Sequence, residues 1–214
     1  MIVLGFDTSA GHCAAALWKD GIILDERRED MKRGQAERLF PLLEDVLAQA
    51  GVAWSDLSAL GVGIGPGNFT GIRLSVSAAR GLALARAIPA VGISSLDALA
   101  HGTEGPVLSC LAAPRDQAYL SGYRTQNPLA PALMALADIP KSLGEPGLTC
   151  VGTAAEAVAD RLGASAAPAP YTSAPAIARI AAERWQDSPA RPAPLYLKPA
   201  DAAPARDTAP TILT

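Results

Sequence analysis

Asp7, Thr8 and Ser9 carry groups suited to phosphate chemistry. They follow the apolar run IVLGF at 2–6, which predicts a first strand, and they precede a second apolar run at 13–18. A carboxylate followed by hydroxyls between two strands can face a metal-bound phosphate. The same residue types also close turns by bonding to backbone amides, so either role fits this position.

The glycine-rich stretch GPGNFTG at 65–71 is the second candidate. It lies between a predicted strand at 59–64 and a predicted helix at 72–87. Glycines let the backbone approach a ligand closely, and a helix N-terminus favours an anion. No Gly-Lys-Ser/Thr follows, and Pro66 breaks the dinucleotide-binding pattern, so a tight strand-to-helix connection is an equally good interpretation. The candidate phosphate-loop positions, which we expect to be degenerate, are Asp7, Thr8, Ser9, Gly65, Gly67, Asn68 and Thr70.

Other reactive residues form no catalytic or metal-binding pattern. His12 and His101 have no Cys, His or carboxylate at metal-ligand spacing, and we expect surface or capping roles for them. No G-x-S-x-G sequence is present. The three cysteines are scattered, which argues against a disulfide framework and against a zinc site. The sequence therefore predicts no catalytic residue and no metal ligand.

The surrounding periodicity predicts an α/β protein of two unequal lobes. Apolar residues recur every three or four positions over 39–50, which indicates one stripe on a helix, and Asp20-Gly21 indicates a hairpin turn. A break near 102–106 precedes a predicted hairpin at 107–113 and 118–124. We expect a first lobe over 1–105, a smaller second lobe over 106–199 and a flexible tail over 200–214. Further predicted elements are a strand at 22–25, a strand at 90–93 and helices at 94–102, 154–163 and 174–187.

Composition narrows the classes of function. Half of the 214 residues are hydrophobic and 18% are charged, so the chain should be globular. The net charge is −3, whereas a protein that binds a nucleic acid by itself usually has a strong basic surplus. Residues 1–11 lack a basic leader, and the apolar runs are too short to span a bilayer. We expect a cytoplasmic protein that does not insert into a membrane.

Several segments together resemble the TsaB family of bacterial tRNA-modification proteins. The match covers most of 1–105 and is patchy beyond that. The segments that carry it are GFDTS at 5–9, ERLFPLL at 37–43, GPGNFTGIR at 65–73, GISSLDAL at 92–99 and PLYLKP at 194–199. The resemblance implies the ASKHA fold of actin, Hsp70 and sugar kinases, with a mixed sheet and flanking helices in each lobe. It also implies a non-catalytic scaffold or activator that pairs with TsaD in threonylcarbamoylation of the tRNA adenosine beside the anticodon.

The resemblance further implies the partners and a partner surface. The expected partners are TsaD, the ATPase subunit TsaE, tRNA indirectly through the complex, and a second copy of this chain. Gln35 stands where relatives carry a metal-binding histidine, and Ala112-Ala113-Pro114 stands where many carry Asp-Ala-Arg, so we expect no cofactor on the isolated chain. The predicted partner interface lies on two helices of the first lobe, at Leu39, Leu42, Leu43, Val46, Leu47, Ile72, Val76, Ala79 and Ala83.

Two rival functions belong to other classes. An ATP-dependent phosphotransferase or ATPase of the ASKHA group would need phosphate and adenosine loops in the second lobe, and we find neither in the sequence. A peptidase-like hydrolase would need a nucleophile or metal constellation, which is also missing from the sequence.

Overall fold

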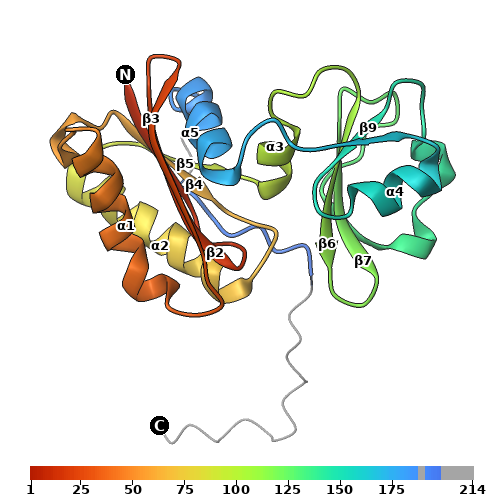
Figure 1. Cartoon of the computed structure of the whole chain (residues 1–214), viewed down its shortest axis with the longest axis horizontal. Helices are drawn as coiled ribbons and strands as arrows, with labels where there is room; N and C mark the ends of the chain where they lie inside the picture. Colours follow the sequence, from red (N-terminus) through yellow and green to blue (C-terminus); the bar gives the residue numbers. More distant parts are fainter. Residues whose placement is uncertain (188–190, 199–214) are drawn as a thin grey trace, which may run out of the picture.

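Two five-stranded sheets lie side by side, each with helices packed against it (Figure 1). The computed structural model describes residues 1–187 and 191–198. The strands are β1 Ile2–Asp7, β2 His12–Lys19, β3 Ile22–Asp30, β4 Ala59–Gly63, β5 Ala90–Ile93, β6 Val107–Ala113, β7 Gln117–Tyr123, β8 Ala132–Ala135, β9 Thr149–Val151 and β10 Ser165–Ala167. The α-helices are α1 Gln35–Gln49, α2 Phe69–Arg86, α3 Ser95–Ala100, α4 Ala155–Leu162 and α5 Ser173–Arg184. Three short 3-10 helices cover Trp54–Asp56, Leu136–Asp138 and Lys141–Leu143.

The first sheet has the strand order β3-β2-β1-β4-β5. The hairpins β1–β2 and β2–β3 are antiparallel, and β1–β4 and β4–β5 are parallel. Asp20 and Gly21 both have positive φ, as the Asp-Gly hairpin turn requires. The second half of the edge strand β3, DERRED at 25–30, carries charged side chains of both signs, which discourages pairing with another chain.

Helices cover both faces of the first sheet. The apolar stripe of α1 and the inner face of α2 pack on one face, where Leu4, Phe6 and Leu60 complete the core. Helix α5 packs on the other face, against β1, β4, β2 and β5. Glycines make this close approach possible, because a Cβ at Gly5 would lie 2.7 Å from the carbonyl oxygen of Ala174 in α5.

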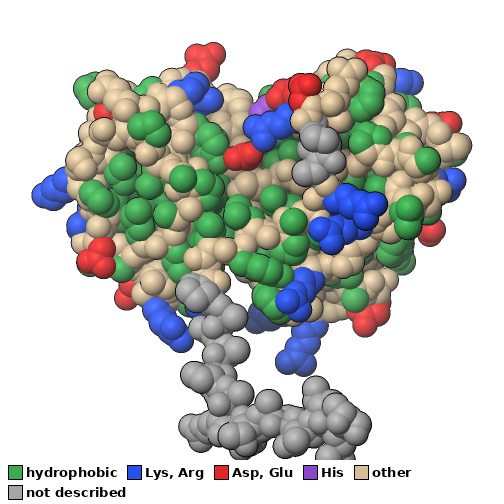
Figure 2. All heavy atoms as spheres, turned by 180° about the vertical axis from the view of Figure 1, so that it is seen from behind, with side chains coloured by type: hydrophobic (Ala, Val, Ile, Leu, Met, Phe, Trp, Pro, Cys, Tyr) green, Lys and Arg blue, Asp and Glu red, His purple; other side chains and the backbone are tan. Residues whose placement is uncertain are grey.

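The second sheet has the order β10-β9-β6-β7-β8, with α4 against one face. Its other face meets α3 near the first lobe, through apolar contacts among Ala100, Val107 and Val151. Seen from behind, apolar side chains gather over the second lobe (Figure 2).

Asp97 of helix α3 bonds to residues of both lobes. One carboxylate oxygen of Asp97 accepts a 2.7 Å hydrogen bond from the Tyr123 hydroxyl of the second sheet. The other pairs with the Arg184 guanidinium of α5 at 2.8 Å. Ser109, fully buried on β6, donates to the carbonyl of Leu96 at 2.7 Å.

The expected second lobe, 106–199, includes two segments that pack on the first lobe, α5 and residues 191–198. The first of these is the helix predicted at 174–187. That helix is α5, and it packs on the first sheet because its buried apolar face matches the face of β1 and β4 left open by α1 and α2. The second sheet and α4 lie within 107–167. The predicted tail, 200–214, lies outside the described residues.

Candidate functional site

The end of β1 and the turn into β2 form a buried polar cluster. Asp7, Thr8, Ser9 and His12 are each at most 5% exposed. One Asp7 oxygen accepts the backbone N–H of Ser9 at 2.9 Å, and the other lies 3.1 Å from His12 Nε2. The predicted surface or capping role of His12 is therefore wrong. The β1–β2 hairpin turns its side chain inward onto the carboxylate.

The ionisation of Asp7 is set by two opposing effects. Complete burial acts to raise the pKa of this carboxyl, because it disfavours the charged form. The hydrogen bond and positive charge of His12, with the bonds from Ser9, outweigh burial and hold the pKa of Asp7 below its ordinary value. Asp7 is thus a charged group held deep in the first lobe.

The glycine loop packs directly on this turn. The backbone N–H of Asn68 donates to the carbonyl of Ser9 at 2.6 Å, and the Thr8 hydroxyl donates to the carbonyl of Gly71 at 2.7 Å. A Cβ at Gly67 would lie 2.1 Å from the Ser9 carbonyl oxygen, and Gly65 has φ +91°. Gly65 therefore needs its left-handed backbone, and Gly67 leaves room for the Asp7 turn that a larger residue would occupy.

The N-terminus of α2 is closed by its own cap. The Asn68 side chain accepts the backbone N–H of Gly71 at 2.9 Å. This bond occupies a donor that an anion at the helix end would otherwise use. Thr70, another predicted phosphate-loop position, is exposed and is not among the residues that line the neighbouring cavity.

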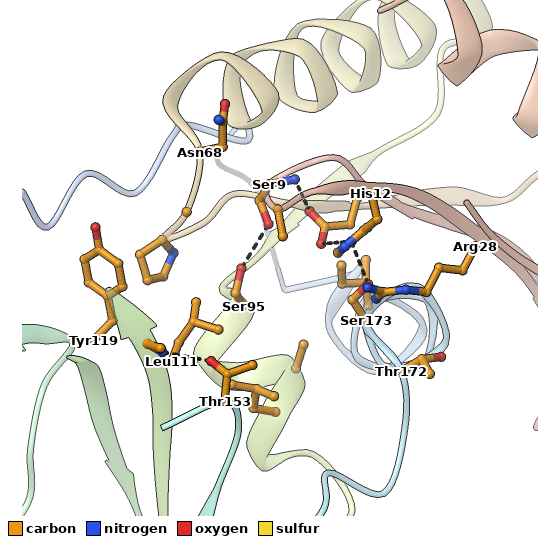
Figure 3. Close-up of a pocket in the computed structure, with 18 of the residues that line it drawn as sticks. Ser9, His12, Arg28, Asn68, Ser95, Leu111, Tyr119, Thr153, Thr172 and Ser173 are labelled. Carbon is orange, nitrogen blue, oxygen red and sulfur yellow. Dashed lines mark hydrogen bonds and ion pairs between the residues drawn. The ribbon is translucent and has the colours of Figure 1, made fainter. Parts of the chain in front are cut away.

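A cavity of about 600 Å³ opens between the two lobes beside this cluster. Asp7, Ser9, Gly67 and Asn68 line it from the first lobe, so the structure brings together four of the predicted loop positions. Figure 3 shows Leu111, Tyr119 and Thr153 approaching from the second lobe, and Thr172 and Ser173 from the start of α5.

With Ser173, the cluster contains a serine, a histidine and an aspartate, but they are not arranged as in a catalytic triad. The Ser173 hydroxyl lies 3.3 Å from His12 Nε2, the same nitrogen that meets Asp7 (Figure 3). A hydrolytic triad needs the acid on one ring nitrogen and the nucleophile on the other. This arrangement orients the imidazole but does not pass a proton from serine to histidine to acid.

No metal-binding cluster accompanies the site. Among residues 1–187 and 191–198, no three His, Cys, Asp or Glu side chains gather closely enough to hold a metal ion. Gln35 stands at the start of α1 and donates a weak 3.4 Å hydrogen bond to the carbonyl of Met31. Ala112 and Pro114, at the end of β6, line the cavity without a charged group.

The predicted partner-interface residues are not on the surface. All but Ala83 are buried within the chain, at 3% exposure or less, and Ala83 is partly buried against the same core. The five-stranded sheet and α2 cover the apolar stripe of α1, so the eight buried residues have almost no surface left for a partner, whereas part of Ala83 stays exposed. The eight are Leu39, Leu42, Leu43, Val46, Leu47, Ile72, Val76 and Ala79.

The last described segment, 191–198, returns to α2. The N–H of Leu195 donates to the carbonyl of Ile64, and Arg80 Nε donates to the carbonyl of Pro192 at 2.7 Å. Tyr196 stacks on Phe69 with ring centroids 5.2 Å apart, and the Arg73 guanidinium lies 3.8 Å from the centre of the Phe69 ring. This explains how the near-C-terminal PLYLKP segment is linked to the glycine-loop helix.

Comparison with known proteins identifies the family. The profile of TsaD, tRNA N6-adenosine threonylcarbamoyltransferase, matches residues 28–184, which is more than half of the chain. The chain belongs to the TsaD family. An uncharacterized protein of Mycobacterium tuberculosis (strain H37Rv) is 36% identical over 209 residues, 94% of each chain.

Some relatives of the chain carry the name TsaB. The tRNA threonylcarbamoyladenosine biosynthesis protein TsaB of Escherichia coli is 34% identical over 129 residues, 58% of this chain. The match spans 55% of the E. coli protein, about half its length. The recognised resemblance to TsaB is therefore confirmed by a family relationship.

The solved structure of YeaZ from Pseudomonas aeruginosa superposes with a TM-score of 0.75 at 25% identity, over 92% of this chain and 99% of that one. The expected ASKHA fold, with two mixed sheets and flanking helices, is confirmed. Within the part of the chain that the structure describes, no helix is long and apolar enough to cross a membrane.

Proposed function

We propose that this chain is a supporting subunit in the biosynthesis of threonylcarbamoyladenosine in tRNA, acting in the cytoplasm with a catalytic TsaD subunit. The observation that carries the proposal is membership of the TsaD family together with named TsaB relatives at 32–34% identity. The net charge of −3 fits a protein that meets tRNA through a complex rather than alone.

The chemistry of the site supports a non-catalytic role. Asp7 and His12 are paired with each other, and the α2 N-terminus is capped by Asn68. Gln35 stands at the start of α1, where an amide is a poor substitute for an imidazole metal ligand. We infer that the isolated chain uses no nucleotide cofactor and that TsaD supplies the reactive groups.

A hydrolase is less well supported. The serine, histidine and aspartate of the cluster meet through a single imidazole nitrogen, so no general base is available to activate Ser173. An ATP-dependent phosphotransferase would use the start of α2 for phosphate, where the Gly71 N–H is already bonded to the Asn68 side chain and the Asn68 N–H to the Ser9 carbonyl.

We place the partner surface on the outer faces of α1 and α2. Phe40 on α1 and Leu84 on α2 are large apolar side chains that remain exposed, Leu84 at 82%. A stable interface buries about 800 Å² on each partner, so it would extend beyond these two side chains along both helices. The same surface is proposed to bind TsaD and, without it, a second copy of this chain, with the ATPase subunit TsaE joining the TsaD complex.

The test is reconstitution with TsaD, TsaE and unmodified tRNA from the same organism, with the modified nucleoside measured by mass spectrometry. Omitting this chain should abolish the modification, and this chain without TsaD should produce none. Modification by this chain and TsaE alone would overturn the supporting role.

The surface is tested separately by Leu84→Glu, which should weaken TsaD binding at least about tenfold, or 1.4 kcal/mol. Ile22→Glu is the matched control, because Ile22 is also exposed, at 65%, but lies on β3. If Leu84→Glu and Ile22→Glu bound TsaD equally well, the interface would not include the exposed face of α2.

A further inference from the structure

The outer side of α2 and the segment 191–198 that packs on it form a basic surface. Residues 57–96 and 191–198 together contain five Lys and Arg and no Asp or Glu, although the whole chain has a net charge of −3. Arg73 and Arg80 lie about two helical turns apart on the exposed side of α2, and the exposed Arg191 begins the segment beside Arg80. Seen from behind, Lys and Arg side chains gather on the first lobe (Figure 2).

Two aromatic rings accompany these cations. Phe69 and Tyr196 are 52% and 45% exposed, and they stack on each other. The Arg73 guanidinium lies over the Phe69 ring, and its Nε donates to the Tyr196 hydroxyl at 2.9 Å. Because each ring keeps about half of its surface in solvent, the pair can stack on a further flat group.

The two guanidinium groups on α2 are held in place but are not neutralised. Arg73 and Arg80 each donate through Nε, to the Tyr196 hydroxyl and to the carbonyl of Pro192, and neither forms an ion pair with an Asp or Glu that the structure describes. A guanidinium carries further N–H donors on Nη1 and Nη2, and these stay open to a ligand. Arg86 differs, since it lies beside Glu44 of α1.

We propose that this surface binds single-stranded RNA, with phosphates at the three exposed arginines and an unpaired base on the Phe69–Tyr196 pair. Cations that follow one side of a helix without acids between them attract a phosphate backbone, and aromatic rings beside them stack on unpaired bases of any sequence. An acidic peptide would satisfy the cations but not the exposed rings. The choice of RNA over DNA rests on the proposed function, but the direct contact goes beyond it, because there tRNA meets the chain through a complex.

The test is fluorescence anisotropy of a labelled oligouridylate of about twelve residues, titrated with the full chain without TsaD. Because the chain as a whole is acidic, binding should be weak, with a dissociation constant on the order of 10⁻⁴ M at about 50 mM salt. The logarithm of the binding constant should fall with the logarithm of the salt concentration with a slope of about −2, as expected for three phosphate contacts on a single strand.

Two substitutions with matched controls locate the site. Arg80→Gln should weaken binding about three- to tenfold through loss of one phosphate contact. Arg124→Gln should leave binding unchanged, because Arg124 is also exposed and also donates to backbone carbonyls, but lies in the second lobe. Tyr196→Leu should weaken binding at least about fivefold through loss of stacking, whereas Tyr171→Leu should not, although that ring is also exposed and also lies beside a guanidinium.

Circular dichroism confirms the fold of each variant before binding is compared. The proposal is overturned if the chain at about 1 mM does not bind oligouridylate, or if Arg80→Gln or Tyr196→Leu binds no more weakly than its control. It is also overturned if a peptide of about twelve glutamates competes as strongly as unlabelled oligouridylate, since the surface would then fit an acidic protein. The proposed role with TsaD would stand in each case, because reconstitution measures it separately.

Discussion

Gly71→Ala is the substitution whose effect the structure defines most sharply. A Cβ at this position would lie 1.8 Å from the carbonyl oxygen of Thr8, and a backbone atom cannot move aside as a flexible side chain can. Either α2 or the β1–β2 turn must shift by more than about 1 Å, because a Cβ essentially never lies within 3.0 Å of another heavy atom. The shift would also disturb the Asn68 cap and the Thr8 hydrogen bond.

The magnitude follows from these separate losses. Overpacking costs about 1–3 kcal/mol, the cap about 0.5–2 and the buried hydrogen bond about 0.5–1.5. Alanine in place of glycine within a helix stabilises the folded chain by about 0.5–1 kcal/mol, which offsets part of these losses. We expect a net loss of about 2–5 kcal/mol in the free energy of unfolding, or roughly 5–15 °C in Tm for a chain of this size.

The assay is urea and thermal unfolding followed by circular dichroism. The control is Gly81→Ala in the same helix, where an added Cβ meets nothing within 4 Å. That variant should be more stable than the wild type by about 0.5–1 kcal/mol, since it gains helix propensity without a clash. If Gly71→Ala proved as stable as Gly81→Ala, the close packing of the glycine loop on the Asp7 turn would be refuted.

Four further outcomes are expected. The pKa of Asp7 is lowered in the folded chain, so the stability that its charge contributes is complete above about pH 4 and is lost as the pH falls through the folded pKa. The free energy of unfolding of the wild type should therefore fall more steeply below about pH 4 than that of Asp7→Asn. His12→Ala should cost about 3–5 kcal/mol, because it leaves a buried carboxylate without its partner; an unchanged urea midpoint would contradict this. Tyr123→Phe should cost about 0.5–1.5 kcal/mol through loss of the bond to Asp97, and proteolysis between the lobes should quicken. Leu43→Glu should prevent folding, since Leu43 is fully buried, and a folded variant by circular dichroism would contradict that burial.

Local patterns predicted most of the first lobe. The period of apolar residues located α1, and glycines and prolines located the turns around β4, α2 and β5. Within 126–170 the sequence predicted the helix at 154–163, which is α4, but none of the strands. Strands β8, β9 and β10 are only three or four residues long and have too few positions to show alternation. Such strands form because neighbouring strands pair with them, which a local pattern does not report.

The candidate site was predicted in part. Asp7, Ser9, Gly67 and Asn68 were singled out and do line one cavity. His12 was missed because its partner follows from the inward turn of the hairpin and not from a metal-ligand spacing. The apolar stripe of α1 correctly indicated a buried face, but the sequence does not state whether the chain's own sheet or another protein covers such a face.

The return of α5 to the first sheet has a consequence for synthesis on the ribosome. Residues 107–167 are complete before α5 begins at Ser173, so the second lobe can fold while the first still lacks a helix. Until α5 arrives, Val3, Ala59, Val91 and Ile93 have no cover on their face of the sheet. A fragment ending at 105 would keep that face open and should aggregate, whereas joining 105 to 168 directly would retain every element of the first lobe.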